Sequence, residues 1–540
     1  MAAIASIDET LEYKIKFNDL NKKCIHVEAF LPTEEDGVLT VQVPQSGIAS
    51  LKINSSYIKI ENVSPLFKRF TFEAQKKIGF QYELCMSEVP FGDIDYPFLN
   101  ERFFSILVYS ALIFPDYPNE KEVKVKISLE NLEPDFKLFG PNGNISKDIA
   151  IQDTVDRFST YILLGTKDDI FDIEVRGKHF FAVTNNKDIS LSSEKIEKYR
   201  NILSFQMSLM NDFDSNPSLL FFLVKPNADL YARHFTNTLS LLMPVNPSNE
   251  MLMRAFSHEY FHRWLGIKMR ADEHLGDLLW FIEGVNDFFG IEATYLTDSV
   301  TFQEYLNIVN DILKEYYLSP ISQLDYDFLS SKIYDDFQYR KTAQVRGYLA
   351  SFAVDVIERG DLIKHPFIKA IKNILNKSTK DDISLTPLMV FENIKNNLEE
   401  SKWEETKSFI NTGINIKLPD EIYNERAKLI NYKIAAADYG FDLEKLFNEK
   451  LIADLDKDSQ AYKIGLRDGM TVLYHDIAFS RPSAEITMYV SENNEVLKFN
   501  FVPSFKYKSI PQYIINPKNK ERFLGARKGG SVLWGNSNKP

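Results

Sequence analysis

The sequence predicts a multidomain α+β protein with a β-rich start, a helical centre attached to a few strands, and a small module near its end. Three observations predict this class. A chain of 540 residues is too long for a single hydrophobic core. The apolar pattern alternates with period two up to about residue 185 and becomes helical between about residues 247 and 398. Short strand-like runs return between residues 432 and 503.

The amino-terminal part consists of short runs rich in β-branched and aromatic residues, separated by Pro, Gly, Asn and Asp. Examples are YKIKF (13–17), VLTVQV (38–43) and VKVKISL (123–129). We therefore expect residues 1–168 to form a β-sandwich-like domain.

The central part, residues 169–425, combines two strand-like runs with longer helical segments. KHFFAV (178–183) and SLLFFLV (218–224) have the composition of strands. Apolar residues recur at spacings of three and four, without an internal proline, in three segments: MLMRAFSHEYFHRWLG, DLLWFIEGVNDFFGIEATYL and AQVRGYLASFAVDVIERG. This pattern predicts a mixed β/helical domain.

Composition excludes several classes of protein. A net charge of −13 and a pI near 5.3 argue against nucleic-acid binding, which needs a surplus of Lys and Arg. No apolar stretch reaches 18 residues, which argues against a membrane span. Two cysteines, Cys24 and Cys85, make no disulfide framework and favour a reducing compartment. With no visible signal peptide, we expect a cytoplasmic protein whose oligomeric state the sequence leaves open.

Residues 506–540 form a basic tail with one acid, Glu521. Its basic residues are Lys506, Lys508, Lys518, Lys520, Arg522, Arg527, Lys528 and Lys539. Such a tail is typically solvated, and binding of an anion or a partner is the alternative.

A metal-binding pattern, HExxH, occurs at residues 258–262 within a helical segment. Residues four apart lie on one helix face, so His258 and His262 can bind one zinc ion while Glu259 acts as the base that activates water. With eight histidines and 76 acidic residues in the chain, the expected number of accidental matches to this pattern is on the order of 0.02. The alternative is two histidines spaced by accident.

A catalytic zinc needs a third protein ligand and an open position. We favour Glu283, because it lies within an apolar helix where an unpaired carboxylate is costly to bury. The alternative for Glu283 is a salt bridge to an arginine such as Arg254 or Arg270. Asp287, one turn later, is expected to accept the free N–H of a ligating histidine, unless it is an ordinary surface carboxylate. The downstream candidates for this ligand are Asp272, Glu273, His274, Asp277, Glu283, Asp287 and Glu292.

HEYFHRW and LLWFIEGVNDFF together resemble the gluzincin metallopeptidases of the glycyl aminopeptidase type. RGYLASFAVDVIER (346–359) resembles that family's helix after the third ligand, and DLDKDSQAYKIGLRDGMTVLYHD (454–476) resembles its carboxyl-terminal PDZ domain. The resemblance implies a thermolysin-like catalytic domain with one Zn²⁺ per chain and a PDZ-like domain over residues 426–505. The loop Tyr439-Gly440-Phe441 would then bind a peptide carboxylate, unless the module only packs against the catalytic cleft.

Two positions depart from the family pattern. Where the family has GGLEH, whose glutamate holds the substrate's free amino terminus, this chain has ADLYARHFT with Tyr231 at the glutamate position. A neutral phenol cannot make the charge-assisted bonds that an ammonium requires, so aminopeptidase specificity is in doubt. His234 and Arg233, on the same segment, are further candidates to face substrate.

The second departure concerns the oxyanion of the tetrahedral intermediate, which needs a hydrogen-bond donor besides the metal. The family's tyrosine, three residues before Gly347, is replaced here by Gln344. An amide can still donate, and Tyr339 or Tyr348 are the nearby phenols. We favour Tyr339, because Tyr348 lies in an apolar helix.

The sequence thus predicts a zinc metallopeptidase that hydrolyses peptide or protein substrates with Glu259 as general base. The alternative is a catalytically weakened, metal-binding scaffold that recruits peptides through its PDZ-like domain.

Overall fold

The computed structural model describes residues 10–516 with interruptions. The interruptions are 20–23, 34–37, 45–47, 55–56, 64–66, 73–76, 86–96, 141–142, 169, 187–191, 213–218, 226–229, 237, 272–273, 355–361, 378–382, 424 and 493–494. The chain divides into two compact units, Met1–Arg263 and Trp264–Pro540. Both units combine strands and helices, which confirms the predicted multidomain α+β class.

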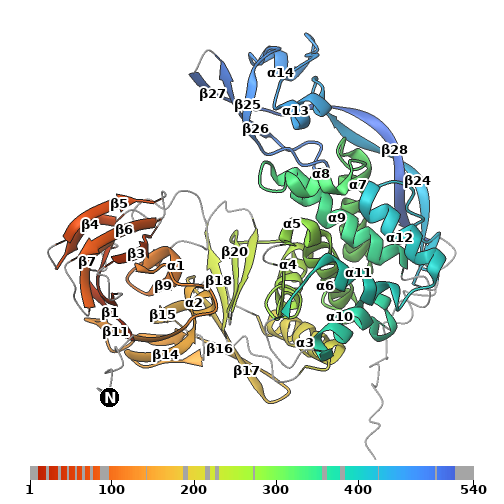
Figure 1. Cartoon of the computed structure of the whole chain (residues 1–540). Helices are drawn as coiled ribbons and strands as arrows, with labels where there is room; N and C mark the ends of the chain where they lie inside the picture. The colour runs from red at the N-terminus through yellow and green to blue at the C-terminus, as the bar shows by residue number, and fades with distance from the viewer. Residues whose placement is uncertain are drawn as a thin grey trace, which may run out of the picture. The chain divides into compact units, whose positions relative to one another are not determined.

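The first unit begins with β-sheets, drawn red to orange in Figure 1. Its six-stranded sheet has the order β14 (Asp148–Thr154), β11 (Glu122–Glu130), β1 (Thr10–Asp19), β2 (Cys24–Pro32), β7 (Lys77–Cys85) and β4 (Ile48–Ile53). A four-stranded sheet contains β10 (Phe114–Pro115), β3 (Val38–Gln42), β6 (Phe67–Phe72) and β5 (Tyr57–Asn62). Side chains of both sheets share one hydrophobic cluster, since alternate residues of strands such as β2 and β11 are buried.

A third sheet of the first unit contains β13 (Gly143–Asn144), β12 (Lys137–Gly140), β15 (Ile162–Thr166), β9 (Phe103–Leu107) and β8 (Phe98–Leu99). The short helix α1 (Val108–Ala111) directly follows β9, and the short helix α2 (Val155–Ser159) precedes β15.

The strands that support the predicted site form a sheet of order β16 (Phe171–Val175), β17 (Lys178–Thr184), β18 (Leu219–Val224), β20 (Thr238–Met243) and β19 (Tyr231–Phe235). β18 is buried along its whole length and runs parallel to both neighbours, as its unbroken apolar sequence allows. The helices α3 (Ser193–Met210) and α4 (Asn249–Phe261) pack together through Tyr199 and Phe256, whose ring centroids are 4.4 Å apart. Because α4 belongs with these strands, the division between the units falls inside the segment 169–425 that we expected to be one domain.

The second unit contains a helical layer. Its elements are β21 (Met269–Arg270), α5 (Leu275–Leu279), the π-helix η3 (Trp280–Val285), α6 (Asn286–Leu296), α7 (Phe302–Leu318), α8 (Tyr326–Ser331), α9 (Phe337–Val354), η4 (Leu362–Lys364), α10 (Pro366–Lys377), β22 (Ile383–Ser384), α11 (Pro387–Lys395) and α12 (Glu400–Thr412). No helix in the described part of the chain is both long enough and apolar enough to span a membrane.

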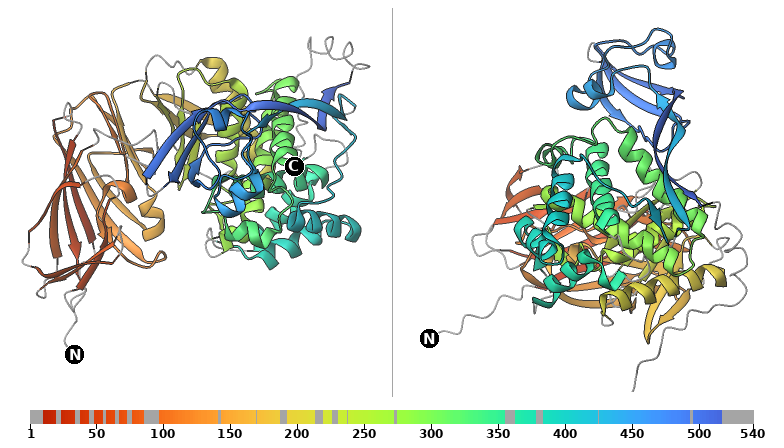
Figure 2. Two further views of the ribbon diagram at one scale, coloured as in Figure 1. Left: turned by 90° about the horizontal axis from the view of Figure 1, so that it is seen from above. Right: turned by 90° about the vertical axis from the view of Figure 1, so that its right-hand side faces the viewer.

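The end of the second unit is a smaller module joined to a long two-stranded ribbon, drawn blue in Figure 2. In the ribbon, β24 (Ala427–Asp438) pairs antiparallel with β28 (Ser504–Ile515), and β23 (Glu421–Ile422) extends β24. The module contains α13 (Leu443–Glu449), α14 (Gln460–Lys463), β25 (Thr471–His475), β26 (Ile486–Glu492) and β27 (Glu495–Phe501).

Residues 506–515 of the expected basic tail therefore lie in a strand, because their backbone pairs with β24 along its whole length. The rest of that tail, with Lys518, Lys520, Arg522, Arg527, Lys528 and Lys539, lies outside the described residues.

The two cysteines correct another expectation. Cys24 of β2 lies directly opposite Cys85 of β7, and their sulfur atoms are 2.10 Å apart in a disulfide. The expectation of a reducing compartment rested on cysteines without a disulfide, and this pairing removes that ground.

Candidate metal centre and active site

The helix α4 brings the two predicted histidine ligands of the first unit together. It begins after Ser248, whose hydroxyl accepts the Met251 N–H at 3.3 Å, and it ends at His262. The Nε2 atoms of His258 and His262 are 2.9 Å apart, and both side chains are buried. Nitrogen ligands of one tetrahedral zinc ion lie about 3.3 Å apart, so this donor pair fits zinc.

Glu259 lies beside this pair and is held by a side chain from the neighbouring strand. The Nδ1 atom of His234, on β19, is 3.1 Å from Oε2 of Glu259, and the Glu259 side chain is only 11% exposed. The His234 ring also stacks on the His262 ring with centroids 4.1 Å apart. The ligand atoms of His234, Glu259 and His262 all lie within 4.8 Å of one another.

The charge state of Glu259 suits a base. Burial raises the pKa of this carboxyl, but the hydrogen bond with His234 and the charges of His262 and His258 outweigh it and hold the pKa below its ordinary value. The carboxylate form is therefore present at neutral pH. From the sequence, His234 is only a candidate to face substrate, and the structure places it against the predicted base.

In the second unit, Glu283 projects from η3, a π-helix of the kind that is frequent at functional sites. Its side chain is 18% exposed, and its Oε1 accepts a hydrogen bond from Nη2 of Arg340 at 3.2 Å. Arg340 on α9, which was not among the arginines considered from the sequence, is thus a partner of Glu283.

Two glycines explain why α9 comes so close to η3. A Cβ atom at Gly347 would lie 1.7 Å from the Trp280 carbonyl oxygen, and one at Gly284 would lie 2.3 Å from the Gln344 carbonyl oxygen. Only glycine permits this contact between the backbones of the two helices. Arg340 and Gln344, one turn apart on α9, can then reach Glu283 within η3 and Asp287 just after it.

Asp287 and Gln344 bind each other. The Nε2 of Gln344 donates to Oδ2 of Asp287 at 3.1 Å, and Asp287 is 3% exposed. The other end of the amide, Oε1, accepts from Nζ of Lys341 at 3.2 Å. Asp287 is thus a buried, paired carboxylate and not an ordinary surface group, and Gln344 is engaged at both ends of its amide.

The tyrosines lie in three different settings. The Tyr339 hydroxyl donates to the Phe447 carbonyl oxygen at 2.7 Å, and the residue is 1% exposed. Burial, with Asp336 and Asp335 nearby, raises the pKa of Tyr339 to about 12. This placement argues against the predicted catalytic role, because the proton that would be donated is already used to hold α13. Tyr348 is fully buried, and Tyr231, at the start of β19, is 44% exposed.

The loop predicted to bind a carboxylate lines a small cavity of about 70 Å³ in the carboxyl-terminal module. Tyr439 and Phe441 contribute to its wall together with Lys506 and Lys508 of β28. Peptide binding there remains a prediction.

Arg340 lies in these surroundings and was not among the residues predicted from the sequence. The available signal was its position four residues before Gln344, which places both on one face of a helix.

Comparisons with known proteins concern the segment that contains the HExxH pattern and the fold of the chain. Residues 251–325 match the model of a peptidase family described as M61 glycyl aminopeptidase. No curated protein matches the chain. Among solved structures, the chain is similar to an aminopeptidase N family protein from Idiomarina loihiensis, with 14% identity, a TM-score of 0.66, and coverage of 92% of this chain and 98% of that chain.

An M1 zinc metallopeptidase from Deinococcus radiodurans is also similar, at 11% identity and a TM-score of 0.47, with 76% of this chain and 96% of that chain covered. The likeness to the Idiomarina protein concerns the fold. The family match covers the segment that contains His258, Glu259, His262 and Glu283, and it supports a peptidase.

Proposed function

We propose that this protein is a zinc-dependent peptidase in which His258, His262 and Glu283 hold one zinc ion and Glu259 is the general base. The observation that carries the proposal is the pair of buried imidazoles on α4, with Nε2 atoms 2.9 Å apart and the Glu259 carboxylate beside them. The peptidase-family match to the same segment supports it. Glu283 enters as third ligand because it is an acid within an apolar helical segment of that match.

The residues divide the chemistry between them. Bound zinc lowers the pKa of a water molecule and polarises the scissile carbonyl group. Glu259 takes a proton from the attacking water and passes it to the leaving amine. His234 fixes one oxygen of the Glu259 carboxylate, which limits the orientations of the base. Asp287 is held by Gln344 and supports the region next to Glu283.

For the substrate, we propose peptides without a required free amino terminus. The described strand β19, with sequence YARHF, carries no carboxylate to pair with an ammonium group. Tyr231 lies on this strand, is 44% exposed, and is the residue that would face the substrate's first position.

The test compares the wild type with Glu259→Gln and with Glu250→Gln, a matched change in the first turn of the same helix. We expect about one zinc per chain in all three proteins by elemental analysis. Peptide turnover should fall by a factor of about 10² to 10⁴ in Glu259→Gln, the range for loss of a general base, and stay unchanged in Glu250→Gln.

Two results would contradict the proposal: absence of stoichiometric zinc in protein purified without chelator, or normal turnover in Glu259→Gln. Zinc binding without hydrolysis of a broad peptide library, together with peptide binding by the 432–503 module, would establish the scaffold alternative. Cleavage that stops when the amino terminus of the substrate is acetylated would show that an amine-binding carboxylate exists elsewhere.

A further inference from the structure

The proposed reaction needs a donor for the oxyanion, and of the three candidates considered from the sequence two are held by other groups and one is buried. The Gln344 amide binds Asp287 and Lys341. The Tyr339 hydroxyl donates to the Phe447 carbonyl oxygen. Tyr348 is fully buried, and its ring packs against Phe288 with centroids 5.9 Å apart. The Tyr339 proton is thus already used and Tyr348 is buried, while the Gln344 amide, which keeps a second N–H, is neutral and stabilises an oxyanion less than a charged donor does.

Arg340 is placed differently. It lies one helical turn before Gln344 on α9, and its side chain is 43% exposed. Within the described part of the chain, the guanidinium has one hydrogen-bond partner, the Glu283 carboxylate. A guanidinium has five N–H donors and keeps its charge at all accessible pH values. One bond to Glu283 therefore leaves several donors directed away from it.

We propose that Arg340 is the catalytic residue that stabilises the oxyanion of the tetrahedral intermediate. The inference rests on the proposed function, since it takes Glu283 as a zinc ligand. A cation within one hydrogen bond of that ligand lies beside the place where the carbonyl oxygen gains charge. In this step the water oxygen bonds to the carbonyl carbon, the water proton passes to Glu259, and the π-electron pair moves to the carbonyl oxygen. Arg340 donates N–H bonds to that oxygen.

A purely supporting role makes a different prediction. If Arg340 only neutralises or orients Glu283, its loss weakens zinc binding, and excess zinc restores turnover. If Arg340 binds the oxyanion, its loss lowers kcat while zinc stays bound. Binding of a tetrahedral analogue then falls as well, because only that geometry carries the negative oxygen.

The experiment uses the full chain with Arg340→Met, Arg340→Lys and the control Arg200→Met. Arg200 is a matched control because it is 38% exposed on helix α3 and also pairs with one glutamate, Glu197. For each protein, zinc content, the zinc dissociation constant, kcat and KM are measured. Binding is compared for two probes: a phosphonamidate peptide, with a tetrahedral phosphoryl group at the scissile position, and the matched ketomethylene peptide.

For Arg340→Met we expect kcat to fall by about 10² to 10³, the effect of losing one oxyanion donor, with KM within about threefold. Affinity for the phosphonamidate should fall by a comparable factor, and affinity for the ketomethylene peptide and zinc content should not change. Arg340→Lys should recover part of the loss, and Arg200→Met should equal the wild type.

Unchanged kcat in Arg340→Met, or a loss that excess zinc restores, overturns the inference. Equal weakening of both probes also overturns it, because Arg340 would then act in general substrate binding. A wild type that binds zinc without hydrolysing any peptide counts against the proposed function, and the comparison of the two probes still decides the role of Arg340.

Discussion

The hydrogen bond between His234 and Glu259 links an edge strand to the helix that carries the HExxH pattern. Hydrogen bonds to charged groups contribute about 1.5 to 3 kcal/mol, which corresponds to roughly 10- to 100-fold in rate if the bond orients the base in the transition state. His234 also stacks on His262, so the ring has two separable effects.

Two substitutions separate these effects. His234→Phe keeps a stacked ring without the hydrogen bond, and we expect kcat to fall by roughly 10- to 100-fold with zinc retained. Since the bond to His234 lowers the pKa of Glu259, its loss raises that pKa, and the acidic limb of the kcat profile should move to higher pH. His234→Asn places an amide donor near the Nδ1 position and should restore part of the rate. An unchanged pH profile in His234→Phe would show that the bond does not act on the base.

At the level of single residues, the sequence predicts the local part of the site well. His258, Glu259 and His262 lie within one helical turn, so helix geometry alone places two imidazoles on one face. Arg340 lies 57 residues after Glu283, and no local pattern marks their contact. His234 was a weak candidate for a similar reason: its partner is 25 residues away on another element.

Among the elements, α9 has two functions. In its first half, Arg340 contacts Glu283 and Gln344 contacts Asp287. The residues at its start hold the carboxyl-terminal module: Gln338 donates to the Ile477 carbonyl oxygen, and Tyr339 donates to that of Phe447. Helix α9 thus connects the module to the surroundings of Glu283.

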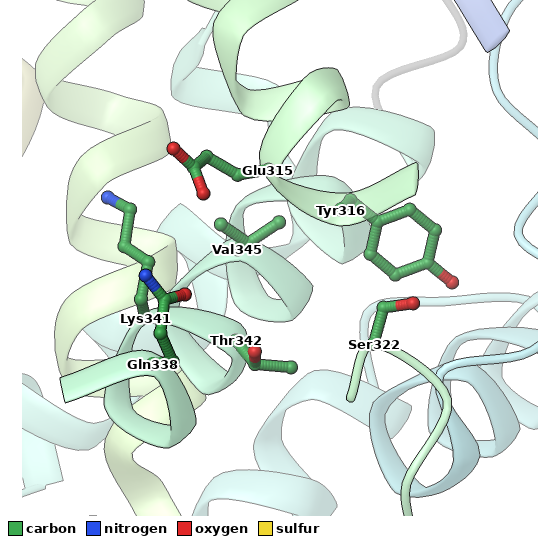
Figure 3. A pocket seen from close by; sticks show the side chains of 7 residues that line it. All are labelled: Glu315, Tyr316, Ser322, Gln338, Lys341, Thr342 and Val345. Carbon is green, nitrogen blue, oxygen red and sulfur yellow. The ribbon is translucent and has the colours of Figure 1, made fainter. Parts of the chain in front are cut away.

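Helix α7 contributes to the same attachment. Figure 3 shows Glu315 of α7 and Gln338 of α9 at a narrow pocket between the two helices. The Glu315 carboxylate accepts the Ser480 backbone N–H at 2.9 Å. The module is therefore held by side chains from both helices.

Asp336, just before α9, is the charged part of this attachment. Its Oδ2 is 2.9 Å from Nζ of Lys450 and 2.9 Å from Nε2 of His475, and it is 9% exposed. Burial raises the pKa of Asp336, but His475, the Gln338 backbone N–H and Lys450 outweigh this and hold the pKa well below its ordinary value. A depressed folded-state pKa stabilises the protein above the ordinary Asp pKa near 4, and this contribution is lost as the pH falls through the folded value.

We therefore expect Asp336→Asn to lower the free energy of unfolding of the second unit by about 3 kcal/mol at pH 7, the cost of removing one partner of a buried ion pair. The difference from the wild type should shrink below about pH 4, where the wild type loses the same contribution. Urea unfolding followed by tryptophan fluorescence measures this, since Trp264, Trp280 and Trp403 all lie in the second unit. Asp335→Asn, at an exposed neighbouring position, is the control and should cost less than about 1 kcal/mol. A pH-independent difference would show that the charge of Asp336 is not what matters.

The elements themselves were predicted unevenly from the sequence. Apolar spacing indicated helices over residues now seen in α4, α6 and α9, because these segments bury one face or their whole surface. The π-helix η3 and its contact with α9 depend on Gly284 and Gly347 meeting across the two helices, which no periodicity reveals. The strand at 506–515 was hidden by Lys506 and Lys508, which lie in its exposed first part, whereas its second half is largely buried.

For the whole molecule, the disulfide Cys24–Cys85 spans 61 residues of sequence but joins directly opposite positions of neighbouring strands. Its presence was not predictable from two isolated cysteines, because the pairing of β2 with β7 is a property of the folded sheet. Closing a loop of this length restricts the unfolded chain and stabilises the native state by roughly 4 kcal/mol in the chain-entropy model.

Because the chain forms two compact units, this stabilisation should act mainly on the first of them. We expect reduction with dithiothreitol, or the double change Cys24→Ser and Cys85→Ser, to accelerate amide hydrogen exchange at Val27 and Tyr82, which pair across β2 and β7. Amides of α9, in the second unit, serve as the internal control and should keep their protection. Alkylation and mass spectrometry of the native protein establish beforehand whether the bond is formed. Equal loss of protection in β2, β7 and α9 would show that the two units unfold as one, and no change anywhere would show that the sheet is stable without its disulfide.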